Sequence, residues 1–305
     1  MAQAAYDVIV IGEGVSGLTA AGALAAAGLK VATIEGTLFG GLVLNVNELE
    51  PGPEGREVSG AELASEMMQA NAEAGVTSIQ EPVTAVRTAD GVQEVTTDSG
   101  THTARHVVVA SGGRLRRLGV PGETEFEGRG VSQCADCDGP MYQDENVIVV
   151  GGGDSALQEA LVLADYARKV HLVHRRDTFT GAAHFADQVK ANAKIAVVWN
   201  ATVEAISGSK MVEKARIKHA DGSTEELPCA GVFAYIGLEP NVEFLPPEVD
   251  RDAEGLVKTD PTLQTSVAGI SAIGAVRSGY EGTLNHAIAE ARLAAGTIAA
   301  KLSSR

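Results

Sequence analysis

Aromatic residues are scarce in this chain, and it has no lysine- or arginine-rich block. Phe, Trp and Tyr make up 4% of 305 residues, whereas glycine occurs 35 times and small aliphatic residues are abundant. That composition is typical of α/β layers in which helices lie close to parallel strands. The formal net charge of −16, without a basic block, argues against nucleic acid or an anionic membrane surface as the partner.

Cysteine is also rare, and three cysteines do not form the framework of a disulfide-rich secreted domain. Cys134 and Cys137 are spaced C-x-x-C, and the third cysteine is the distant Cys229. A zinc site usually needs two further soft ligands, and the chain has no second C-x-x-C and no paired histidines. The sequence therefore favours redox chemistry at this pair over metal binding, and we expect no metal site.

Long hydrophobic runs are missing as well. No run reaches the roughly 18 apolar residues that a membrane helix needs. The apolar N-terminus differs from a secretory signal, because Asp7 and Glu13 interrupt it and no basic residue precedes it. We therefore expect a soluble, cytoplasmic protein.

The N-terminal segment carries the pattern of a dinucleotide-binding unit. The β-branched run Val8–Val10 leads into a G-x-G-x-x-G motif made by Gly12, Gly14 and Gly17, and a helix of small residues follows. Such glycines let backbone N–H groups approach a pyrophosphate at the helix N-terminus. Glu35 ends the next strand, about 20 residues on. In this motif an acid at that position binds a ribose hydroxyl of the dinucleotide. The alternative is a tight turn in an ordinary βαβ unit.

A second unit of the same kind begins at Asn146. Its strand leads into the turn formed by Gly151, Gly152, Gly153, Asp154, Ser155 and Ala156. Its second strand is followed by His174, Arg175 and Arg176 instead of an acid. Guanidinium groups pair with a 2′-phosphate, so we expect this site to prefer NADP over NAD. A solvated basic strand end is the alternative.

Two domains accommodate these units. We predict an α/β fold with two Rossmann-like dinucleotide-binding domains, the second inserted in the first. The first domain comprises residues 1–114 and 245–305, and the second, which carries the C-x-x-C, comprises residues 115–244. Other expected elements are a loop at Pro51–Gly60, helices at Ala61–Gly75 and Thr283–Leu302, and strands at Val83–Arg87, Val92–Thr97, His106–Ala110, Ala196–Ile206, Ala215–His219, Ala230–Ile236 and Gly269–Ile273.

With two nucleotide turns flanking a C-x-x-C, the sequence resembles the low-molecular-weight thioredoxin reductases, which are class II pyridine nucleotide-disulfide oxidoreductases. The likeness covers almost the whole chain, through Gly12–Gly17, Gly40–Gly41, Ala110–Gly112, Cys134–Gly139, Gly151–Ala156, His174–Asp177, Trp199–Asn200 and Thr265–Ile270. It implies FAD on the first unit, NADPH on the second, and a homodimer. It also implies that Gly40, Gly41, Ser111, Gly112, Gly274 and Ala275 contribute to the FAD site, and that the substrate is a thioredoxin-like protein or a small disulfide or dithiol.

The resemblance also implies a role for each residue of the redox loop. Cys137 faces the flavin, Cys134 attacks the substrate disulfide, and Asp138 protonates the departing thiolate. Two adjacent thiols suit this reaction, because exchange passes through a mixed disulfide that the second thiol resolves. In this family the dithiol domain rotates, which makes Arg114–Gly122 and Gly237–Phe244 the expected hinges.

The chain departs from the family pattern around the flavin. Leu42 replaces the usual Gln, Val43–Asn47 replaces a threonine-rich loop, Ala275 replaces the usual Asp, and Glu281-Gly282 replaces Arg-Gln. Ala275 cannot accept a carboxylate's hydrogen bond, a loss of about 1.5–3 kcal/mol unless another group compensates. We therefore expect a remodelled flavin pocket. Near the nicotinamide cofactor, Thr180 stands where the family has a third arginine.

Three functions are compatible with these residues. The first is an NADPH-dependent, FAD-containing disulfide reductase. The second is a flavin-dependent dithiol oxidase that passes electrons from a small dithiol to oxygen, and the third is a redox sensor that lost the flavin and does not turn over. The cluster of changes near the flavin favours altered chemistry, whereas the Gly151–Ala156 turn and the basic strand end favour NADPH. We favour the reductase.

Overall fold

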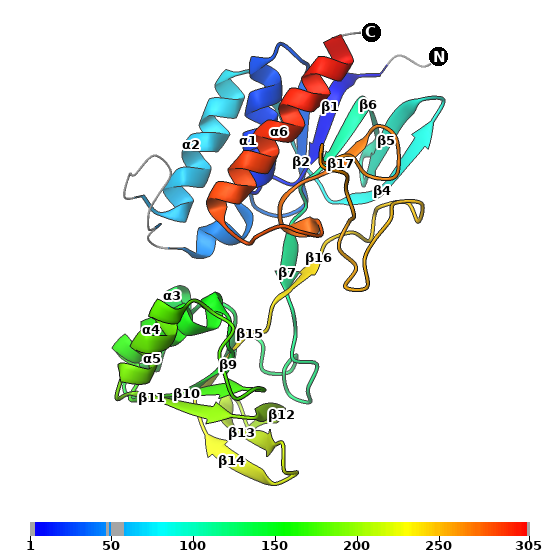
Figure 1. The fold of residues 1–305 in the computed structure, drawn as a ribbon. Coiled ribbons are helices and arrows are strands. Elements are labelled where there is room, and N and C mark those ends of the chain that lie inside the picture. The colour runs from blue at the N-terminus through cyan, green and yellow to red at the C-terminus, as the bar shows by residue number, and fades with distance from the viewer. Residues whose placement is uncertain (1–3, 47–48, 50–57, 304–305) are drawn as a thin grey trace. The chain divides into compact units, whose positions relative to one another are not determined.

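A computed structural model describes residues 4–46, 49 and 58–303. The chain divides into two units, one from Met1–Arg114 with Glu239–Arg305 and the other from Leu115–Leu238 (Figure 1). Two short strands, β7 (Gly113–Leu115) and β16 (Leu238–Pro240), pair with each other where the chain passes between the units. Most of the loop expected at Pro51–Gly60 lies outside the described residues.

A mixed sheet forms the centre of the first unit, in the order β3-β2-β1-β6-β5-β4, with β17 also paired to β6. Its parallel strands are β1 (Tyr6–Ile11), β2 (Val31–Glu35), β3 (Thr77–Gln80), β6 (Gly100–Val109) and β17 (Ile270–Ala272). Strand β5 (Val92–Thr97) pairs antiparallel with β6, and β4 (Val83–Ala89) pairs antiparallel with β5 at the edge. Helices α1 (Val15–Ala26), α2 (Gly60–Glu73) and α6 (Leu284–Ser303) pack together beside the sheet (Figure 1).

Successive side chains of β1 point to opposite faces of the sheet, and both faces are buried, which explains why this strand is central. Val8 and Val10 belong to the cluster that includes α1 and α6, whereas Ile9 and Ile11 belong to the cluster on the opposite face. A strand buried on both faces is continuously apolar, as parallel strands usually are. Fully buried alanines on the two helices, such as Ala20 and Ala291, allow close packing, which accounts for the scarcity of aromatic residues.

A parallel sheet in the order β11-β10-β9-β15-β8 forms the centre of the second unit. Its strands are β8 (Val131–Ser132), β9 (Asn146–Gly151), β10 (Lys169–His174), β11 (Ile195–Trp199) and β15 (Gly231–Tyr235). One face packs on α4 (Asp154–Tyr166) and α5 (Ala183–Ala191). The other face packs on an antiparallel sheet of β12 (Ala201–Gly208), β13 (Val212–His219) and β14 (Thr224–Pro228). Both units confirm the predicted α/β fold.

One predicted strand is wrong. The run Ala196–Ile206, expected to be continuous, is divided at Asn200 into β11 and β12, which belong to different sheets. Asn200 has a φ of 52°, a left-handed conformation that asparagine tolerates better than most residues. The structure also contains β3, β14 and α5, which the sequence pattern did not predict.

Candidate functional site

The first glycine turn lies at the carboxyl end of β1 and leads directly into α1. Gly12 has a φ of 104°, and a Cβ atom there would lie 2.4 Å from the Ala110 carbonyl oxygen. A Cβ on Gly17 would lie 1.9 Å from the Gly12 carbonyl oxygen. Glycine at both positions is therefore required by the close approach of backbone to backbone. The turn is fixed by its own packing, before any cofactor is considered.

The side of this turn at Gly14 is open, unlike the side at Gly12 and Gly17. The Gly40 N–H donates to the Glu13 carbonyl at 2.7 Å, which brings the second glycine pair against the first turn. A Cβ on Gly14 would meet only the Gly40 carbonyl oxygen, at 3.8 Å. Gly14 is also the N-cap of α1 and provides no side-chain cap. The first N–H groups of α1 can therefore bind the pyrophosphate of a dinucleotide.

Glu35 lies where the sequence predicts a ribose ligand, at the end of β2. Its Oε2 accepts the Glu13 N–H at 3.0 Å, and its Oε1 accepts the backbone and side-chain donors of Thr37, each at 3.0 Å. The carboxylate is thus held beside the glycine turn. Since each carboxylate oxygen can accept about two hydrogen bonds, Oε2 retains capacity for a ribose hydroxyl.

Glu13, the variable position in the motif, is fully buried and was missed as a structural residue. Its carboxylate accepts hydrogen bonds from Thr33 Oγ1 at 2.5 Å, Ser78 Oγ at 2.6 Å and Gln80 Nε2 at 2.9 Å. Two of these donors come from β3, which the sequence did not predict. The buried carboxylate joins the glycine turn to β2 and β3.

The other predicted FAD residues approach the same strand ends. Ser111 Oγ donates to the Asn241 carbonyl at 2.6 Å, and the Asn241 N–H donates to the Gly112 carbonyl at 3.1 Å. A Cβ on Gly274 would lie 2.4 Å from Ser16 Oγ, at the start of α1. Ala275 follows in the short helix η4 (Gly274–Val276). The structure thus brings the predicted FAD residues to one edge of the sheet.

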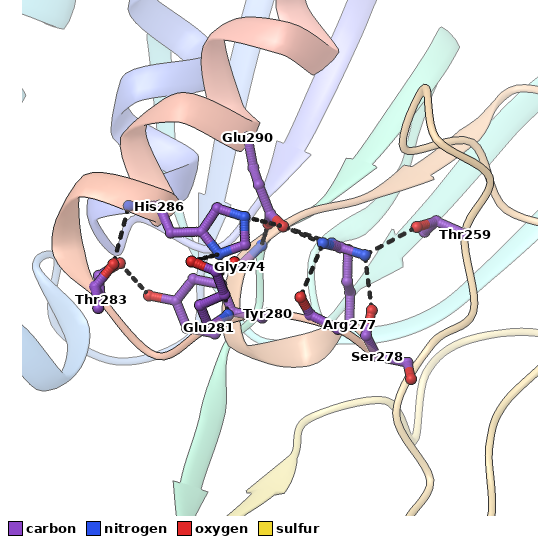
Figure 2. Close-up of polar contacts among 10 residues, drawn as sticks. Thr259, Gly274, Arg277, Ser278, Tyr280, Glu281, Thr283, His286 and Glu290 are labelled. Atoms are coloured by element: carbon purple, nitrogen blue, oxygen red, sulfur yellow. Dashed lines mark hydrogen bonds and ion pairs between the residues drawn. The ribbon is translucent and has the colours of Figure 1, made fainter. Parts of the chain in front are cut away.

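A buried carboxylate supports the Gly274 turn, although not the one that the family pattern suggests. Glu290 of α6 accepts the Gly274 N–H on Oε2 at 2.8 Å and pairs through Oε1 with the Arg277 guanidinium, whose Nε is 2.8 Å away (Figure 2). The Glu290 and Arg277 side chains are 4% and 14% exposed. Breaking a buried ion pair by removing one partner costs about 3–5 kcal/mol. Glu290, which belongs to α6, therefore holds the Gly274 turn in place.

His286 extends this network towards Glu281 (Figure 2). Its Nδ1 accepts the Glu281 N–H at 2.9 Å, so Nε2 carries the proton of the neutral ring. That Nε2 lies 3.4 Å from Glu290 Oε1, and the ring stacks on Tyr280 with centroids 5.5 Å apart. Leu42, another departure from the family pattern, is 42% exposed in η1 (Gly41–Asn45). Asn47 lies outside the described residues, and the other changed positions lie in or beside η1, in η4 and just before α6.

The second glycine turn repeats the features of the first. Gly151 has a φ of 149°, and a Cβ on it would lie 2.3 Å from the Tyr235 carbonyl oxygen. Gly153 is the N-cap of α4, again without a side-chain cap, and Asp154, Ser155 and Ala156 form the first turn of that helix. The Asp154 carboxylate accepts the Ala182 N–H at 2.6 Å. This helix terminus can also bind a pyrophosphate.

The basic strand end divides into a buried part and an exposed part. His174 is buried, with its ring beneath Gly152 and its Nε2 2.9 Å from the Thr178 carbonyl oxygen. Arg175 and Arg176 are exposed, and no ion pair to either is found among the described residues. The two guanidinium groups are available to a 2′-phosphate, whereas His174 supports the turn beneath it.

Thr180, at the position of the missing arginine, makes a different contact. Its backbone N–H and its Oγ1 both donate to the Gly152 carbonyl, at 2.8 and 3.1 Å. The residue therefore ties its loop to the glycine turn, which leaves Arg175 and Arg176 as the exposed arginines beside that turn.

The C-x-x-C forms a disulfide in the structure. Cys134 and Cys137 have Cα atoms 5.3 Å apart, within the range that a disulfide spans. Cys134 is the N-cap of the single-turn helix α3 (Ala135–Asp138), and its Sγ accepts the Cys137 N–H at 3.1 Å. The loop therefore places a backbone N–H donor on the sulfur of Cys134.

Ser132, which sequence reasoning missed, organises the acid of this loop. Its hydroxyl donates to Asp138 Oδ2 at 2.6 Å and accepts the Cys134 N–H at 3.2 Å. One side chain therefore fixes both the carboxylate and the backbone of the first cysteine. No pattern in the sequence distinguishes Ser132 from other polar loop residues.

Two further side chains lie against the loop and were also missed. The Ala135 N–H donates to Glu159 Oε2 and to Tyr235 Oη, each at 3.1 Å. Burial raises the pKa of Glu159 to about 7, although its hydrogen bonds with Tyr235 and Ala135 lower it. Burial likewise raises the pKa of Tyr235. Cys229 is buried away from this chemistry, and desolvation raises its pKa to about 12.

Neither a metal site nor a membrane span emerges from the described ranges. Residues 4–46, 49 and 58–303 contain no group of three or more His, Cys, Asp or Glu side chains arranged to hold a metal ion. Within the same ranges no helix has the length and apolarity to cross a membrane.

Comparison with known proteins agrees with this geometry. The sequence model of the pyridine nucleotide-disulphide oxidoreductase family matches residues 6–291. The chain is 41% identical over 275 residues to a thioredoxin reductase of Treponema pallidum, which covers 90% of this chain and 89% of that protein. It is 39% identical over 273 residues to a bifunctional thioredoxin reductase/thioredoxin of Mycobacterium leprae, covering 88% of this chain and 60% of that one.

A solved structure shows the same fold. The crystal structure of Lactococcus lactis thioredoxin reductase superposes with a TM-score of 0.94 at 30% sequence identity, covering 98% of this chain and 100% of that one. The similarity therefore extends over both nucleotide turns and the disulfide loop.

Proposed function

The chain belongs to the thioredoxin reductases, within the pyridine nucleotide-disulphide oxidoreductase family, and from this we propose that it reduces the disulfide of a thioredoxin-like protein through Cys134 and Cys137. It is an NADPH-dependent, FAD-containing disulfide oxidoreductase. The observation that carries the proposal is the Cys134–Cys137 disulfide with Asp138 fixed beside it by Ser132. A relative that joins reductase and thioredoxin in one chain supports the choice of partner over a small disulfide.

The residues at each nucleotide turn fit the two cofactors. The glycines of the first turn, the uncapped start of α1, Glu35 and the Gly274 turn suit FAD. The start of α4, with Arg175 and Arg176 exposed beside it, suits NADPH. Bound NADPH supplies a hydride, and bound FAD relays the electron pair to the disulfide.

Substrate reduction uses the side chains of the loop. Once the disulfide is reduced, the Cys134 thiolate attacks a sulfur of the substrate disulfide, which breaks that bond and forms a mixed disulfide. Asp138 gives a proton to the departing substrate thiolate. Cys137, as a thiolate, then attacks Cys134, which releases the second substrate thiolate and restores the Cys134–Cys137 disulfide. The Cys137 N–H on the Cys134 sulfur supports Cys134 as the attacking group.

The oxidase and the sensor are less well supported. An oxidase has no need for the exposed arginines beside the second turn, and a sensor that lost the flavin has no need for the open glycine turn of the first. The relatives favour the reductase.

We further propose a homodimer in the cytoplasm, which light scattering and cell fractionation can test.

Anaerobic spectroscopy tests the proposal. The purified protein should lose its flavin absorbance on addition of NADPH, and oxidised thioredoxin should restore it. Cys134→Ser and Cys137→Ser should each abolish thioredoxin reduction while flavin reduction by NADPH persists. Cys229→Ser is the matched control, because that thiol is buried in the core. Rapid reoxidation by air with no response to thioredoxin would favour the oxidase.

A further inference from the structure

A closed set of hydrogen bonds lies directly beneath the disulfide loop. The N–H of Ala135, which stands between the two cysteines, is shared between Glu159 Oε2 and Tyr235 Oη. The Tyr235 hydroxyl in turn donates to Glu159 Oε2 at 3.1 Å. Two donors, one from α3 and one from β15, therefore meet at one carboxylate oxygen of α4. The Glu159 carboxylate contacts the loop through the backbone N–H of Ala135, the residue that follows Cys134.

The surroundings make this carboxylate sensitive to charge. Ala135 and Tyr235 are buried within the core of the second unit, and Glu159 is held between them without an ion-pair partner among the described residues. Burial is the main cause of its pKa of about 7, and the nearby Asp136 raises that pKa further. Glu159 therefore changes charge in the pH range where cysteine thiols become reactive.

Asp138 has a different arrangement. Its carboxylate is held by the Ser132 hydroxyl, whereas Glu159 is held by a backbone N–H and a phenol. The loop thus has two carboxyl groups with separate partners. One can serve the departing thiolate, and the other remains tied to the turn.

We propose that Glu159, assisted by Tyr235, is a positioning residue for thiol–disulfide exchange that holds the turn through the Ala135 N–H and sets the ionisation of the reduced cysteines. The idea rests on the proposed function of Cys134 and Cys137. A like charge nearby disfavours a second charge. Ionised Glu159 therefore opposes thiolate formation, and protonation of Glu159 relieves that opposition. Ionisation of Glu159 and formation of a cysteine thiolate in the loop above it therefore disfavour each other.

The pH dependence of alkylation tests the electrostatic part. The full-length, FAD-bound protein is reduced anaerobically with dithiothreitol, freed of reductant and treated with iodoacetamide from pH 5.5 to 9, and the cysteine peptides are quantified by mass spectrometry. In Glu159→Gln, which keeps the shape of the side chain, the pH of half-maximal rate should fall by about half a unit or more. Asp165→Asn removes an exposed carboxylate from the same helix and should leave the profile unchanged. Coincident profiles for wild type and Glu159→Gln would overturn the coupling.

Hydrogen exchange tests the positioning part. Glu159→Leu combined with Tyr235→Phe removes both acceptors of the Ala135 N–H, and exchange in the peptide spanning residues 131–142 should accelerate at least about fivefold. Wild-type exchange rates in this variant would overturn the positioning role. If the double variant does not fold, Glu159→Leu alone should still accelerate exchange in this peptide, by a smaller factor. Wild-type exchange rates in Glu159→Leu would then overturn the positioning role. Neither measurement uses NADPH or thioredoxin, so failure here is distinct from failure of the proposed function.

Discussion

The backbone N–H of Gly274 donates to Glu290 Oε2 at 2.8 Å, so a side chain sixteen residues away holds the turn at which the family pattern places a Gly-Asp pair. Ala275 has no polar side chain with which to bind the ribityl chain. Glu290 does not replace that missing ligand directly, because its carboxylate binds the turn and Arg277 (Figure 2). It instead holds the backbone of the turn through the Gly274 N–H where the family ligand is absent.

Glu290→Gln should therefore weaken FAD binding. Glutamine has one acceptor oxygen in place of two and no charge to pair with the buried Arg277, and losing a hydrogen bond to a charged group costs about 1.5–3 kcal/mol. The dissociation constant for FAD should rise roughly 10- to 100-fold, measured by flavin fluorescence during titration of the apoprotein. Glu254→Gln, at an exposed position of the first unit, is the control. Equal FAD affinity in both variants would contradict a supporting role for Glu290.

Sequence patterns predicted the parts of the molecule whose chemistry is local. The two glycine turns follow from close backbone contacts, such as that of Gly12 with Ala110, which only glycine allows. Glu290 and Tyr235 could not be predicted, because their contacts depend on how separate elements pack together. Ser132 makes local contacts with Cys134 and Asp138, but no pattern distinguishes it from other polar loop residues. The strand break at Asn200 was missed for another reason, since a single residue in a left-handed conformation leaves no periodic signal.

The arginines after β10 should discriminate between the two nicotinamide cofactors. Arg175→Ala and Arg176→Ala each remove a guanidinium that we propose pairs with the 2′-phosphate, and losing such a charged hydrogen bond costs about 1.5–3 kcal/mol. The KM for NADPH should rise roughly 10- to 100-fold while the KM for NADH changes little. Steady-state kinetics with both cofactors measures the difference. Lys190→Ala, which removes an exposed cation from α5, controls for general electrostatics, and a parallel effect on NADH would rule out recognition of the 2′-phosphate.

Thr180 offers the reverse experiment. Thr180→Arg removes the Oγ1 hydrogen bond to the Gly152 carbonyl but leaves the backbone one. The third guanidinium should increase the preference for NADPH over NADH several-fold, seen in the ratio of kcat/KM values. An unchanged ratio would indicate that the loop cannot present a side chain at position 180 to the phosphate.

Ser132→Ala should slow thioredoxin reduction without slowing reduction of the flavin. The change frees the Asp138 carboxylate and leaves the Cys134 N–H without its acceptor, and general acid catalysis by a positioned group contributes about 10²–10⁴-fold to a rate. We expect kcat with thioredoxin to fall at least about tenfold, while stopped-flow bleaching by NADPH keeps its wild-type rate. Gln133→Ala, at the exposed neighbouring position, should match wild type in both assays. Slowing of both reactions in Ser132→Ala would point to a general disturbance of the second unit.

His106 should make the first unit sensitive to acid. It is buried in β6, its Nε2 lies 2.9 Å from Ser271 Oγ, and burial, with a smaller effect of Lys301, lowers its pKa to about 3. Because the folded-state pKa lies below the unfolded value of about 6.5, the unfolded chain binds the proton more tightly. This contribution to stability is fully present above pH 6.5 and is lost as the pH falls towards 3, by about 1.4 kcal/mol per pH unit. Denaturant titrations at pH 7.5 and 5 should show that His106→Gln loses about 2 kcal/mol less than wild type. His184→Gln, at an exposed position of α5, should follow wild type, and a parallel loss in all three proteins would assign the acid sensitivity to other groups.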